Sequence, residues 1–378
     1  MFALLAELPR ESVIDVTGTV RRSEKSNRGV ELFPERIEVL ARAGVPLPLG
    51  VVDRVSADLD TRLNHRVLDL RKPEVSAIFE VRSAMLAGFR EAFLERGFLE
   101  IETPKLLRAG AEGGATLFAV DYFGGPAYLA QSPQLYKQML IGAGFERVFE
   151  IAPAFRAEPS DTVRHLTEFG SLDAEMGYID DVEDVRRMLE EVLAAAIRTA
   201  HRRLADAGNP HVDRLPEVRT PFPRIPFSTA EEWLGRAGAG LDFGTEDEKV
   251  IGERALQEHG NPFYYLTDFP TSVKERTFYA QRQDADPSRT WYFDLDYRGV
   301  EIVSGGAREH RLDRVIANMR SAGLDPGSFE GYLEAFRYGM PPHGGWGLGV
   351  DRLVMVLLGL GNVREARLFP RDRYRLDP

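Results

Sequence analysis

The amino-acid sequence predicts an α+β fold in which helices flank a mostly antiparallel sheet. Its 378 residues exceed one ordinary domain, and 43% apolar with 28% charged residues is typical of a globular protein with a sizeable core. Predicted strands follow one another in runs, and helices interrupt them at irregular intervals. That order favours an α+β sheet over a repeated βαβ array.

The first 50 residues are predicted to form strands. Alternating or β-branched stretches at 13–20, 30–32 and 37–40 are separated by a polar turn at 23–29. Two or three strands cannot close a barrel alone.

The first long helix is predicted over 73–96, where apolar residues recur at helical spacing and Gly97 provides the end signal. A strand is predicted directly after it, over 98–103. That strand should stop at Pro104, which cannot donate to the ladder.

The rest of the chain alternates irregularly between predicted strands and helices. Further strands are expected at 127–130, 148–152, 170–178, 292–295 and 299–304. Helices are expected at 182–203, after an Asp180/Asp181 cap, and at 312–322.

Composition excludes several classes of function. The chain has no Cys, so it has no disulfide, no thiol nucleophile and no cysteine-bound zinc. A net charge of −11 argues against binding nucleic acid through overall charge, although a local basic face could still do so. No 18-residue apolar run and no signal pattern is present, so we expect a cytoplasmic protein without a membrane segment.

Two neighbouring strands near the middle of the chain carry charges where a buried sheet should be apolar. By the period of two, Arg156 and Glu158 should point to one side of the first strand, and Asp173 and Glu175 should share a side of the second. One Arg among three carboxylates is costly unless the charges pair or hold a ligand. The alternative is a solvated sheet face.

A glycine-rich turn opens an apolar helix near the C-terminus. Gly347 and Gly349 would let the backbone approach a ligand closely, and Arg352 would be a buried charge that needs an anion. An internal ion pair with Asp351 is the alternative.

Oxygen-bearing side chains on two short strands suit a hard cation. Asp294, Glu301 and Ser304 are the ligand types that Mg²⁺ prefers, and substrate phosphates often complete its coordination. Scattered surface carboxylates are the alternative.

Three stretches, in order, resemble the three motifs of class II aminoacyl-tRNA synthetases. The first ends at Glu102, Thr103 and Pro104, the second covers 155–158 and 164–169, and the third covers 347–352. The resemblance runs from about residue 67 to the end and is strongest to archaeal-type aspartyl-tRNA synthetases of the aspartyl, asparaginyl and lysyl subgroup. It implies a class II antiparallel sheet, a homodimer formed through the first motif, and the use of ATP and Mg²⁺.

The resemblance also implies how ATP is bound. Arg156 would bind the α-phosphate, Glu158 the adenine amino group, and Phe169 would stack on adenine. The charges of Arg164 and His165 would reach the outer phosphates.

Arg352 would bind the γ-phosphate and the base. Asp294, Glu301 and Ser304 match the Mg²⁺ positions of the family. Adenylation needs positioning and charge neutralisation rather than a side-chain nucleophile.

The segment 131–138 resembles the aspartyl form of the amino-acid pocket. Lys137 and Arg308 would both face the side-chain carboxylate of L-aspartate, and such a pair rejects a neutral amide. Asparaginyl enzymes lack that Lys, so the resemblance favours aspartate. Four residues would surround the α-ammonium group: Glu112, Ser132, Gln134 and Asp173. Glu112 lies in a glycine-rich stretch that resembles the closing loop of the family, and a flexible connection is its alternative.

Residues 1–50 resemble only the second half of the OB-fold barrel that reads the anticodon in this subgroup. We therefore expect a partial OB fold at 1–50, a hinge at 51–66 and a class II catalytic domain at 67–378. Either the chain starts late or it is a truncated paralogue.

Three functions remain open at this point. The leading hypothesis is an aspartate–tRNA ligase that charges tRNA(Asp) and, as an open choice, tRNA(Asn). The second is a paralogue that adenylates aspartate without charging tRNA, as asparagine synthetases of the ammonia-using type do. The third, a non-catalytic sensor of ATP or an amino acid, is disfavoured because every ATP and Mg²⁺ position holds a competent residue.

Overall fold

The structure, a computed structural model, describes residues 2–26, 29–51, 57–108, 117–157 and 162–377. The chain divides into two compact units, Met1–Val75 and Ser76–Pro378, and helix α4 (Pro73–Glu95) spans the division. Each unit is described by itself below. The predicted α+β class is confirmed.

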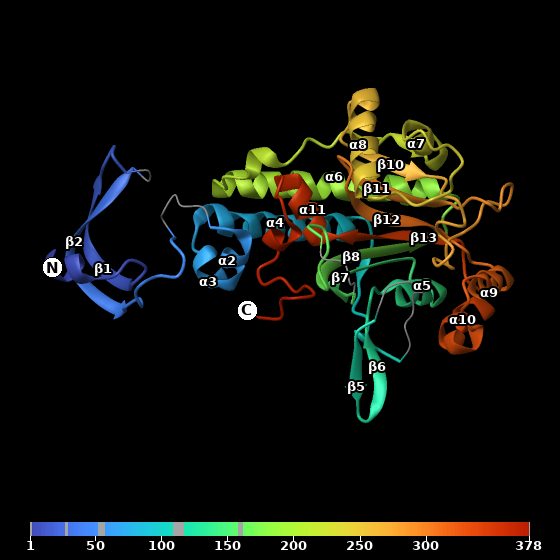
Figure 1. Cartoon of the computed structure of the whole chain (residues 1–378), viewed down its shortest axis with the longest axis horizontal. Helices are drawn as coiled ribbons and strands as arrows, with labels where there is room; N and C mark the ends of the chain where they lie inside the picture. The colour runs from blue at the N-terminus through green and yellow to red at the C-terminus, as the bar shows by residue number, and fades with distance from the viewer. Residues whose placement is uncertain (1, 27–28, 52–56, 109–116, 158–161, 378) are drawn as a thin grey trace. The chain divides into compact units, whose positions relative to one another are not determined.

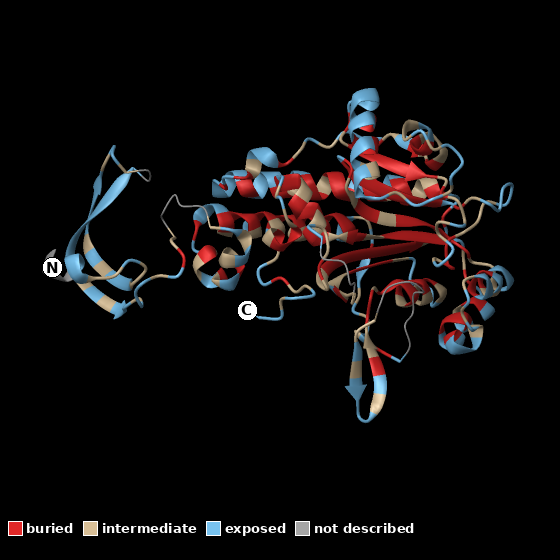
Figure 2. Ribbon diagram, viewed as in Figure 1, coloured by how far each residue is buried: buried red, intermediate tan, exposed pale blue. Residues whose placement is uncertain are grey.

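The first unit contains an antiparallel pair of strands. β1 (Val13–Arg22) pairs with β2 (Val30–Ala41), and a register shift falls between Thr17 and Gly18. β2 runs without a break through Pro34, where the sequence suggested two shorter runs. Most residues of both strands are exposed (Figure 2). The unit also contains the short helices α1 (Phe2–Glu7), α2 (Leu59–Asn64) and α3 (Arg66–Asp69).

One face of this strand pair is apolar. Ile14 lies opposite Val39, and Val16 lies opposite Ile37, so four apolar side chains share one face. Charged pairs such as Asp15 and Glu38 occupy the other face. The pattern is that of a sheet with one face made for burial.

The second unit is built on an eight-stranded sheet of order β3-β7-β8-β13-β12-β11-β10-β9 (Figure 1). All neighbours are antiparallel except β3 with β7 and β10 with β9. The strands are β3 (Leu99–Glu100), β7 (Arg147–Phe155), β8 (Glu168–Gly177), β9 (Arg224–Pro226), β10 (Phe263–Thr267), β11 (Tyr292–Tyr297), β12 (Glu301–Arg308) and β13 (His343–Gly349).

β3 is shorter than the predicted strand at 98–103. Thr103 leaves the ladder because its backbone N–H and its hydroxyl both donate to the Glu150 carboxylate, each over 2.8 Å. Lys105 donates to the same carboxylate, also over 2.8 Å. A buried side chain, rather than a neighbouring strand, therefore fixes the approach to Pro104.

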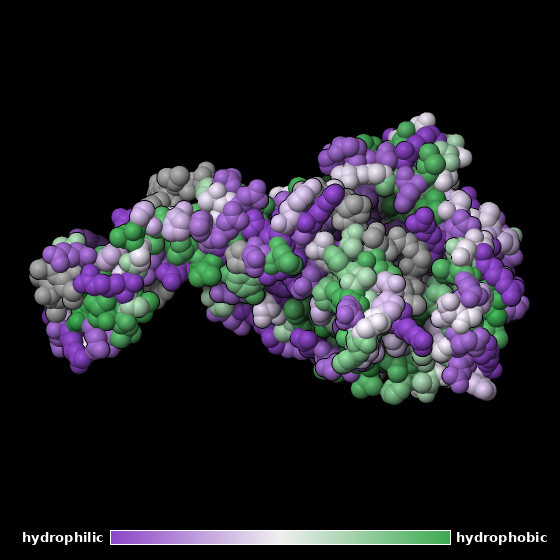
Figure 3. All heavy atoms as spheres, turned by 60° about the horizontal axis from the view of Figure 1, so that its bottom comes forward, coloured by the Kyte–Doolittle hydropathy of each residue, from purple (hydrophilic) through white to green (hydrophobic). Residues whose placement is uncertain are grey.

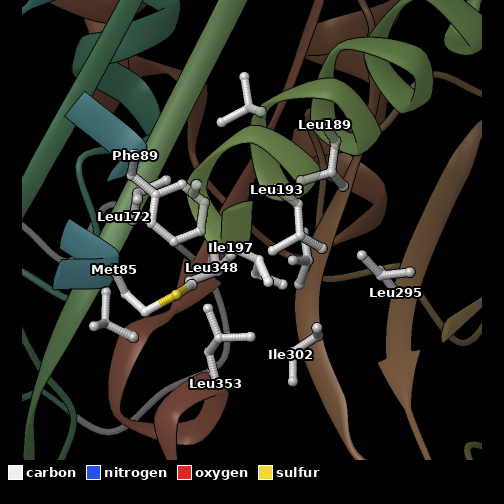
Figure 4. Packing of buried hydrophobic residues seen from close by; sticks show 14 of the residues in the cluster. Met85, Phe89, Leu172, Leu189, Leu193, Ile197, Leu295, Ile302, Leu348 and Leu353 are labelled. Carbon is white, nitrogen blue, oxygen red and sulfur yellow. The ribbon is translucent and has the colours of Figure 1, made fainter. Parts of the chain in front are cut away.

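The main core lies between the sheet and helices α4, α6 (Val182–Ala207) and α11 (Val350–Leu358). Figure 4 shows Phe89 of α4 beside Leu172 of the sheet, and Leu193 of α6 belongs to the same cluster. These side chains are almost completely buried. The predicted helix at 73–96 is thus confirmed, and its apolar stripe covers the sheet.

A second apolar cluster involves helices α5 (Gln134–Gly142), α9 (Leu312–Ser321) and α10 (Glu330–Arg337). A third joins α7 (Phe227–Trp233) and α8 (Thr245–His259) to β10. Helices α5, α7, α8 and α10 were not predicted from the sequence. Short turns complete the unit: η1 (Val212–Arg214), η2 (Pro326–Phe329) and η3 (Val363–Ala366).

A separate three-stranded sheet has the order β4-β6-β5, with β4 (Leu106–Leu107), β5 (Ala119–Tyr122) and β6 (Gly125–Leu129). Phe123 at its tip is 95% exposed and has a φ of +51°. Figure 3 shows apolar and hydrophilic residues side by side on the face of the second unit that carries this hairpin.

No helix in the described part of the chain is both long and apolar enough to cross a bilayer.

Candidate active site

A cavity of about 700 Å³ opens over the centre of the large sheet, where β8, β13 and β12 lie side by side. This volume is in the range of small-molecule sites. Ten of the predicted site residues line it: Ser132, Gln134, Arg156, Arg164, His165, Phe169, Asp173, Glu301, Ser304 and Arg352. Lys137, Arg308 and Asp294 are buried beside it. Glu112 and Glu158 lie outside the described residues.

Arg156 and Phe169 form one wall of the cavity. Arg156 follows the end of β7, and its guanidinium carbon lies 5.2 Å from the centre of the Phe169 ring on β8. The backbone N–H of Arg156 donates to the Thr167 carbonyl over 2.9 Å. Its Nε atom is buried without a hydrogen-bond partner among the described residues, so a donor is ready for an anion.

Arg352 lies in the first turn of α11 and forms part of the opposite wall of the cavity. It is half-buried, with 26% of its side chain exposed, so the expectation of a fully buried charge is wrong. Its Nη1 donates to the Glu301 carbonyl over 2.8 Å, and the Glu301 carboxylate lies 3.8 Å away. A cation at a helix N-terminus opposes the helix dipole, and a bound anion would relieve that repulsion.

Asp351 does not form an ion pair with Arg352, so the internal pair of these two residues, the alternative given in the sequence analysis, is also wrong. Its carboxylate instead lies 2.7 Å from Arg82 Nη1 and accepts from the Gly170 backbone N–H over 2.6 Å. This contact ties the start of α11 to α4 and β8. Arg352 is left facing the cavity.

The predicted magnesium residues lie near one another, since Glu301 and Ser304 line the cavity and Asp294 is buried beside Ser304. The Ser304 hydroxyl donates to Asp294 Oδ1 over 2.6 Å, and Lys274 Nζ donates to Asp294 Oδ2 over 2.8 Å. Lys274 is also 4.1 Å from the centre of the Phe269 ring. The sequence analysis missed Lys274, although it is one of only six lysines in the chain.

These residues fit a Mg²⁺ ion that substrate phosphates complete. Burial first, and then the charge of Asp294, raise the pKa of Glu301, while the charges of Arg352, Lys274 and Arg156 work against that rise. Mg²⁺ needs only one or two protein carboxylates when phosphates supply the remaining ligands. In the described part of the chain, no group of three His, Cys, Asp or Glu residues is arranged to hold a metal by itself.

A cluster of four charges is buried under the other end of the cavity. Lys137 Nζ donates to Asp173 Oδ1 over 3.1 Å and to the Trp346 carbonyl over 2.9 Å, and it lies 3.4 Å from Glu175 Oε2. Arg308 Nε donates to Glu175 Oε1 over 2.9 Å. Asp173 and Glu175 thus share one face of β8, as the period of two predicts. Direct contact between Lys137 and a substrate stays a prediction, because its donors are already engaged by the protein.

Glu175 was not among the predicted site residues, yet its carboxylate contacts both Arg308 and Lys137. Burial alone would raise the pKa of Glu175, but the charges of Arg308 and Lys137 outweigh burial and hold that pKa below its ordinary value. The carboxylate is therefore ionised and neutralises the cluster. The sequence indicated that Glu175 is a charged residue within a strand, but it did not indicate which residues would pair with it.

Two buried hydrogen-bond donors on neighbouring side chains have no acceptor in the described part of the chain. Arg308 Nη2 donates to Gln134 Oε1 over 3.4 Å, while Arg308 Nη1 and Gln134 Nε2 have no partner in the described part of the chain. Unpaired buried donors are rare and costly. Their arrangement fits a carboxylate that accepts from both groups.

His343 contacts helix α5, which carries Lys137 of the charged cluster. Burial lowers its pKa to about 4, so the ring is neutral at pH 7. Its Nδ1 lies 2.9 Å from the Pro341 carbonyl and must donate there, so Nε2 accepts from Gln138 Nε2 over 2.9 Å. Gln138 follows Lys137 on α5, so the contact anchors the helix that carries both Lys137 and Gln134.

Arg164 and His165 lie in the loop that precedes β8, and both line the cavity. Arg164 forms an ion pair with Glu248 of α8, a residue that sequence analysis did not single out. His165 Nδ1 lies 2.6 Å from the Thr162 hydroxyl.

At the start of α5, the Ser132 hydroxyl accepts a hydrogen bond from the Gln134 backbone N–H over 3.1 Å.

The antiparallel sheet thus carries a cavity over its central strands, and Arg156, Arg164 and Arg352 line this cavity. The family model of class II tRNA synthetases (D, K and N) matches residues 58–373, and the chain belongs to this family.

Its relatives narrow the family further. The chain is 47% identical to an aspartate–tRNA(Asp) ligase of Thermococcus kodakarensis, over 100% of this chain and 87% of the relative. It is 49% identical to an aspartate–tRNA(Asp/Asn) ligase of Methanopyrus kandleri, over 100% of this chain and 86% of the relative. A solved asparaginyl-tRNA synthetase of Pyrococcus horikoshii, complexed with asparaginyl-adenylate, matches with a TM-score of 0.89 and 33% identity, over 100% of this chain and 86% of that one.

Proposed function

We propose that this protein is an aspartate–tRNA ligase that activates L-aspartate with ATP and transfers it to tRNA. The observation that carries the proposal is the pair of unpaired donors on Arg308 and Gln134 at one end of a cavity whose other end holds Arg156 and Arg352. One end suits the side-chain carboxylate of aspartate, and the other suits a triphosphate. The names of the relatives agree with this pairing of substrates.

In the activation step, the α-carboxylate of aspartate attacks the α-phosphorus of ATP, and the bond to pyrophosphate breaks. Arg156 would neutralise the charge that grows on the α-phosphate, and Phe169 beside it would stack on adenine. Arg352, Arg164 and His165 would hold the outer phosphates. Mg²⁺, held by Glu301, Ser304 and Asp294, would supply further charge neutralisation at the phosphates.

The amino acid would be held by residues of α5, β8 and β12. Arg308 would bind the side-chain carboxylate, and Lys137 and Glu175 would set the charge behind it. Asp173, Ser132 and Glu112 are proposed around the α-ammonium group. Gln134, which the resemblance also placed there, is assigned instead to the side-chain carboxylate, because its unpaired buried atom is the Nε2 donor. A site that already donates from Arg308 and Gln134 offers no acceptor for the amide N–H₂ of asparagine, which would therefore bind weakly.

We also infer the partners of the reaction. The tRNA would be tRNA(Asp), and tRNA(Asn) is a second candidate because a relative is named for both. The active form would be a cytoplasmic homodimer that pairs through α4 and β3. The relatives described above bear the names of tRNA ligases, so the alternatives without tRNA have no support there.

We further propose three regions along the chain: a partial OB fold for anticodon binding at 1–50, a hinge at 51–66 and a class II catalytic domain at 67–378. The apolar face of the β1–β2 pair supports an OB-type sheet in the first region.

The amino-acid specificity can be tested directly. Exchange of pyrophosphate into ATP should require Mg²⁺ and aspartate, and asparagine should support it at least about a hundredfold less well, because a buried charged site discriminates strongly against a neutral isostere. Exchange with asparagine as fast as with aspartate would contradict the assignment.

The transfer step needs its own assay. Transcripts of tRNA(Asp) and tRNA(Asn) should be incubated with labelled aspartate and ATP, beside an ammonia-dependent asparagine assay. We expect charging of tRNA(Asp) and no asparagine formation. Aspartate activation without any tRNA charging would favour the paralogue instead.

A further inference from the structure

The loop between β7 and β8 is anchored by the C-terminal segment on its returning side. The Val363 backbone N–H donates to the Val163 carbonyl over 2.8 Å, and Arg364 Nη1 donates to the Thr162 carbonyl over 3.2 Å. These two bonds fix the backbone on the N-terminal side of Arg164. The backbone anchor leaves the long Arg164 side chain to be placed by other contacts.

Helix α8 and the β11–β12 turn supply those contacts. Arg164 Nη1 donates to Glu248 Oε2 in an ion pair, and Arg164 Nη2 lies 3.4 Å from the Gly299 carbonyl as a second donor. Only 12% of the Arg164 side chain and 20% of the Glu248 side chain are exposed. A guanidinium has five N–H donors, so this arrangement leaves others for a ligand in the cavity that Arg164 lines.

The position of Glu248 is itself fixed by close backbone packing. Gly252, one turn further along α8, lies so near the β11–β12 turn that an added Cβ would overlap the backbone nitrogen of Gly299. Gly299 has a φ of +75°, and an added Cβ there would overlap the Glu248 carbonyl. The helix is thus set directly against the turn that leads to Glu301. Glu248 cannot move away from the cavity without breaking this contact.

The charges around Glu248 make the pair interdependent. Burial raises the pKa of Glu248 above its ordinary value, although the positive charge of Arg164 works against that rise. Glu301 adds repulsion, and Arg352 adds attraction. Without Arg164, Glu248 would be a poorly compensated carboxylate, and without Glu248, Arg164 would lose the group that orients it.

We propose that Glu248 is a positioning residue for ATP binding. It fixes the Arg164 guanidinium at the cavity wall. The remaining N–H donors of Arg164 are then already oriented for the outer phosphates of ATP before ATP binds. The proposal rests on the role of Arg164 proposed above. A side chain that must be ordered during binding weakens affinity by a fewfold to about tenfold, and Glu248 removes that cost in advance.

The chain offers a matched control one residue away. Asp247 lies on the same helix, accepts from Arg236 Nη2 over 2.8 Å and accepts from the Gly244 backbone N–H over 2.9 Å. It therefore also ties α8 to its surroundings. Neither Asp247 nor Arg236 lines the cavity. Comparing Glu248→Gln with Asp247→Asn separates a role in binding from a role in stability.

The test is the affinity for a non-hydrolysable ATP analogue, measured by calorimetry, together with the melting temperature and the KM values for ATP and aspartate. Glu248→Gln should raise the Kd of the analogue and the KM for ATP about fivefold to tenfold, and it should leave the KM for aspartate within about twofold. Asp247→Asn should leave the Kd unchanged, even if the melting temperature falls as much. Arg164→Ala should weaken binding, and adding Glu248→Gln to it should have no further effect.

Three results would overturn the proposal: an unchanged Kd in Glu248→Gln, tighter binding in that variant, or a loss of affinity that persists in the Arg164→Ala background. Tighter binding would mean that Glu248 competes with the phosphates. Wild-type protein that binds the analogue but shows no aspartate-dependent exchange would contradict the proposed ligase activity alone. Wild-type protein that fails to bind the analogue would overturn both.

Discussion

Replacing Arg156 or Arg352 with alanine is expected to reduce aspartate-dependent pyrophosphate exchange about a hundredfold to a thousandfold. Each arginine faces the cavity with a charge that the protein leaves incompletely compensated: Arg156 has an unpaired buried Nε in the described part of the chain, and the Glu301 carboxylate lies 3.8 Å from Arg352. Loss of one such contact to a developing charge costs roughly 3–4 kcal/mol of transition-state stabilisation. Exchange rates at saturating ATP and aspartate measure the effect.

The control for this pair is Arg187→Ala. Arg187 is 66% exposed on its side chain and pairs with Asp184 on the surface of α6, so exchange should be unchanged. Melting temperatures of all three variants should stay close to that of the wild type. Near-normal exchange in either site variant, or its unfolding, would mean that the arginine serves the fold rather than the reaction.

Replacing Glu175 with alanine is expected to lower the free energy of unfolding by about 3–5 kcal/mol, because it leaves Arg308 and Lys137 buried beside each other with only Asp173 to compensate them. Chemical denaturation at pH 7 measures this loss. Aspartate activation should fail as well, since Arg308 would lose the carboxylate that orients it.

The acid dependence of Glu175 has a definite sign. The pKa of Glu175 is lowered in the folded protein, so its contribution is present above the pKa of the unfolded chain and is lost as the pH falls. The wild type should therefore lose stability in acid more steeply than Glu175→Ala. As a control, Glu330→Ala breaks an exposed pair with Arg337 and should cost less than about 1 kcal/mol. Equal losses in the two alanine variants would contradict the central role of Glu175.

The sequence was sufficient for features that depend on local pattern. The helix predicted over 73–96 is α4 (Pro73–Glu95), because an apolar stripe and a following glycine are both local signals. The strand that carries Asp173 was likewise predicted, at 170–178. Strand β13, which ends at Gly349, was not predicted, because its glycines indicated only a turn before a helix. The three motifs in order were enough to indicate the family that the comparisons confirm.

The partners of charged residues could not be predicted in the same way. Glu248 contacts a residue 84 positions away, and Arg308 contacts one 133 positions away. Such pairs depend on which strands become neighbours, and no local periodicity encodes that order. For the same reason Asp351 was paired with its sequence neighbour, while the fold pairs it with Arg82.

The order of strands in the large sheet also determines when the protein can finish folding during its synthesis. β8 must pair with β13, and roughly 170 residues separate them, so at about 5–20 residues per second the ribosome needs on the order of ten seconds or more to deliver the partner. During that wait one edge of β8 has no strand beside it, and free edges promote pairing with other chains. The two carboxylates that later hold Lys137 and Arg308 would discourage such pairing in the growing chain. Charges that serve the finished site would thus also protect the nascent protein from aggregation.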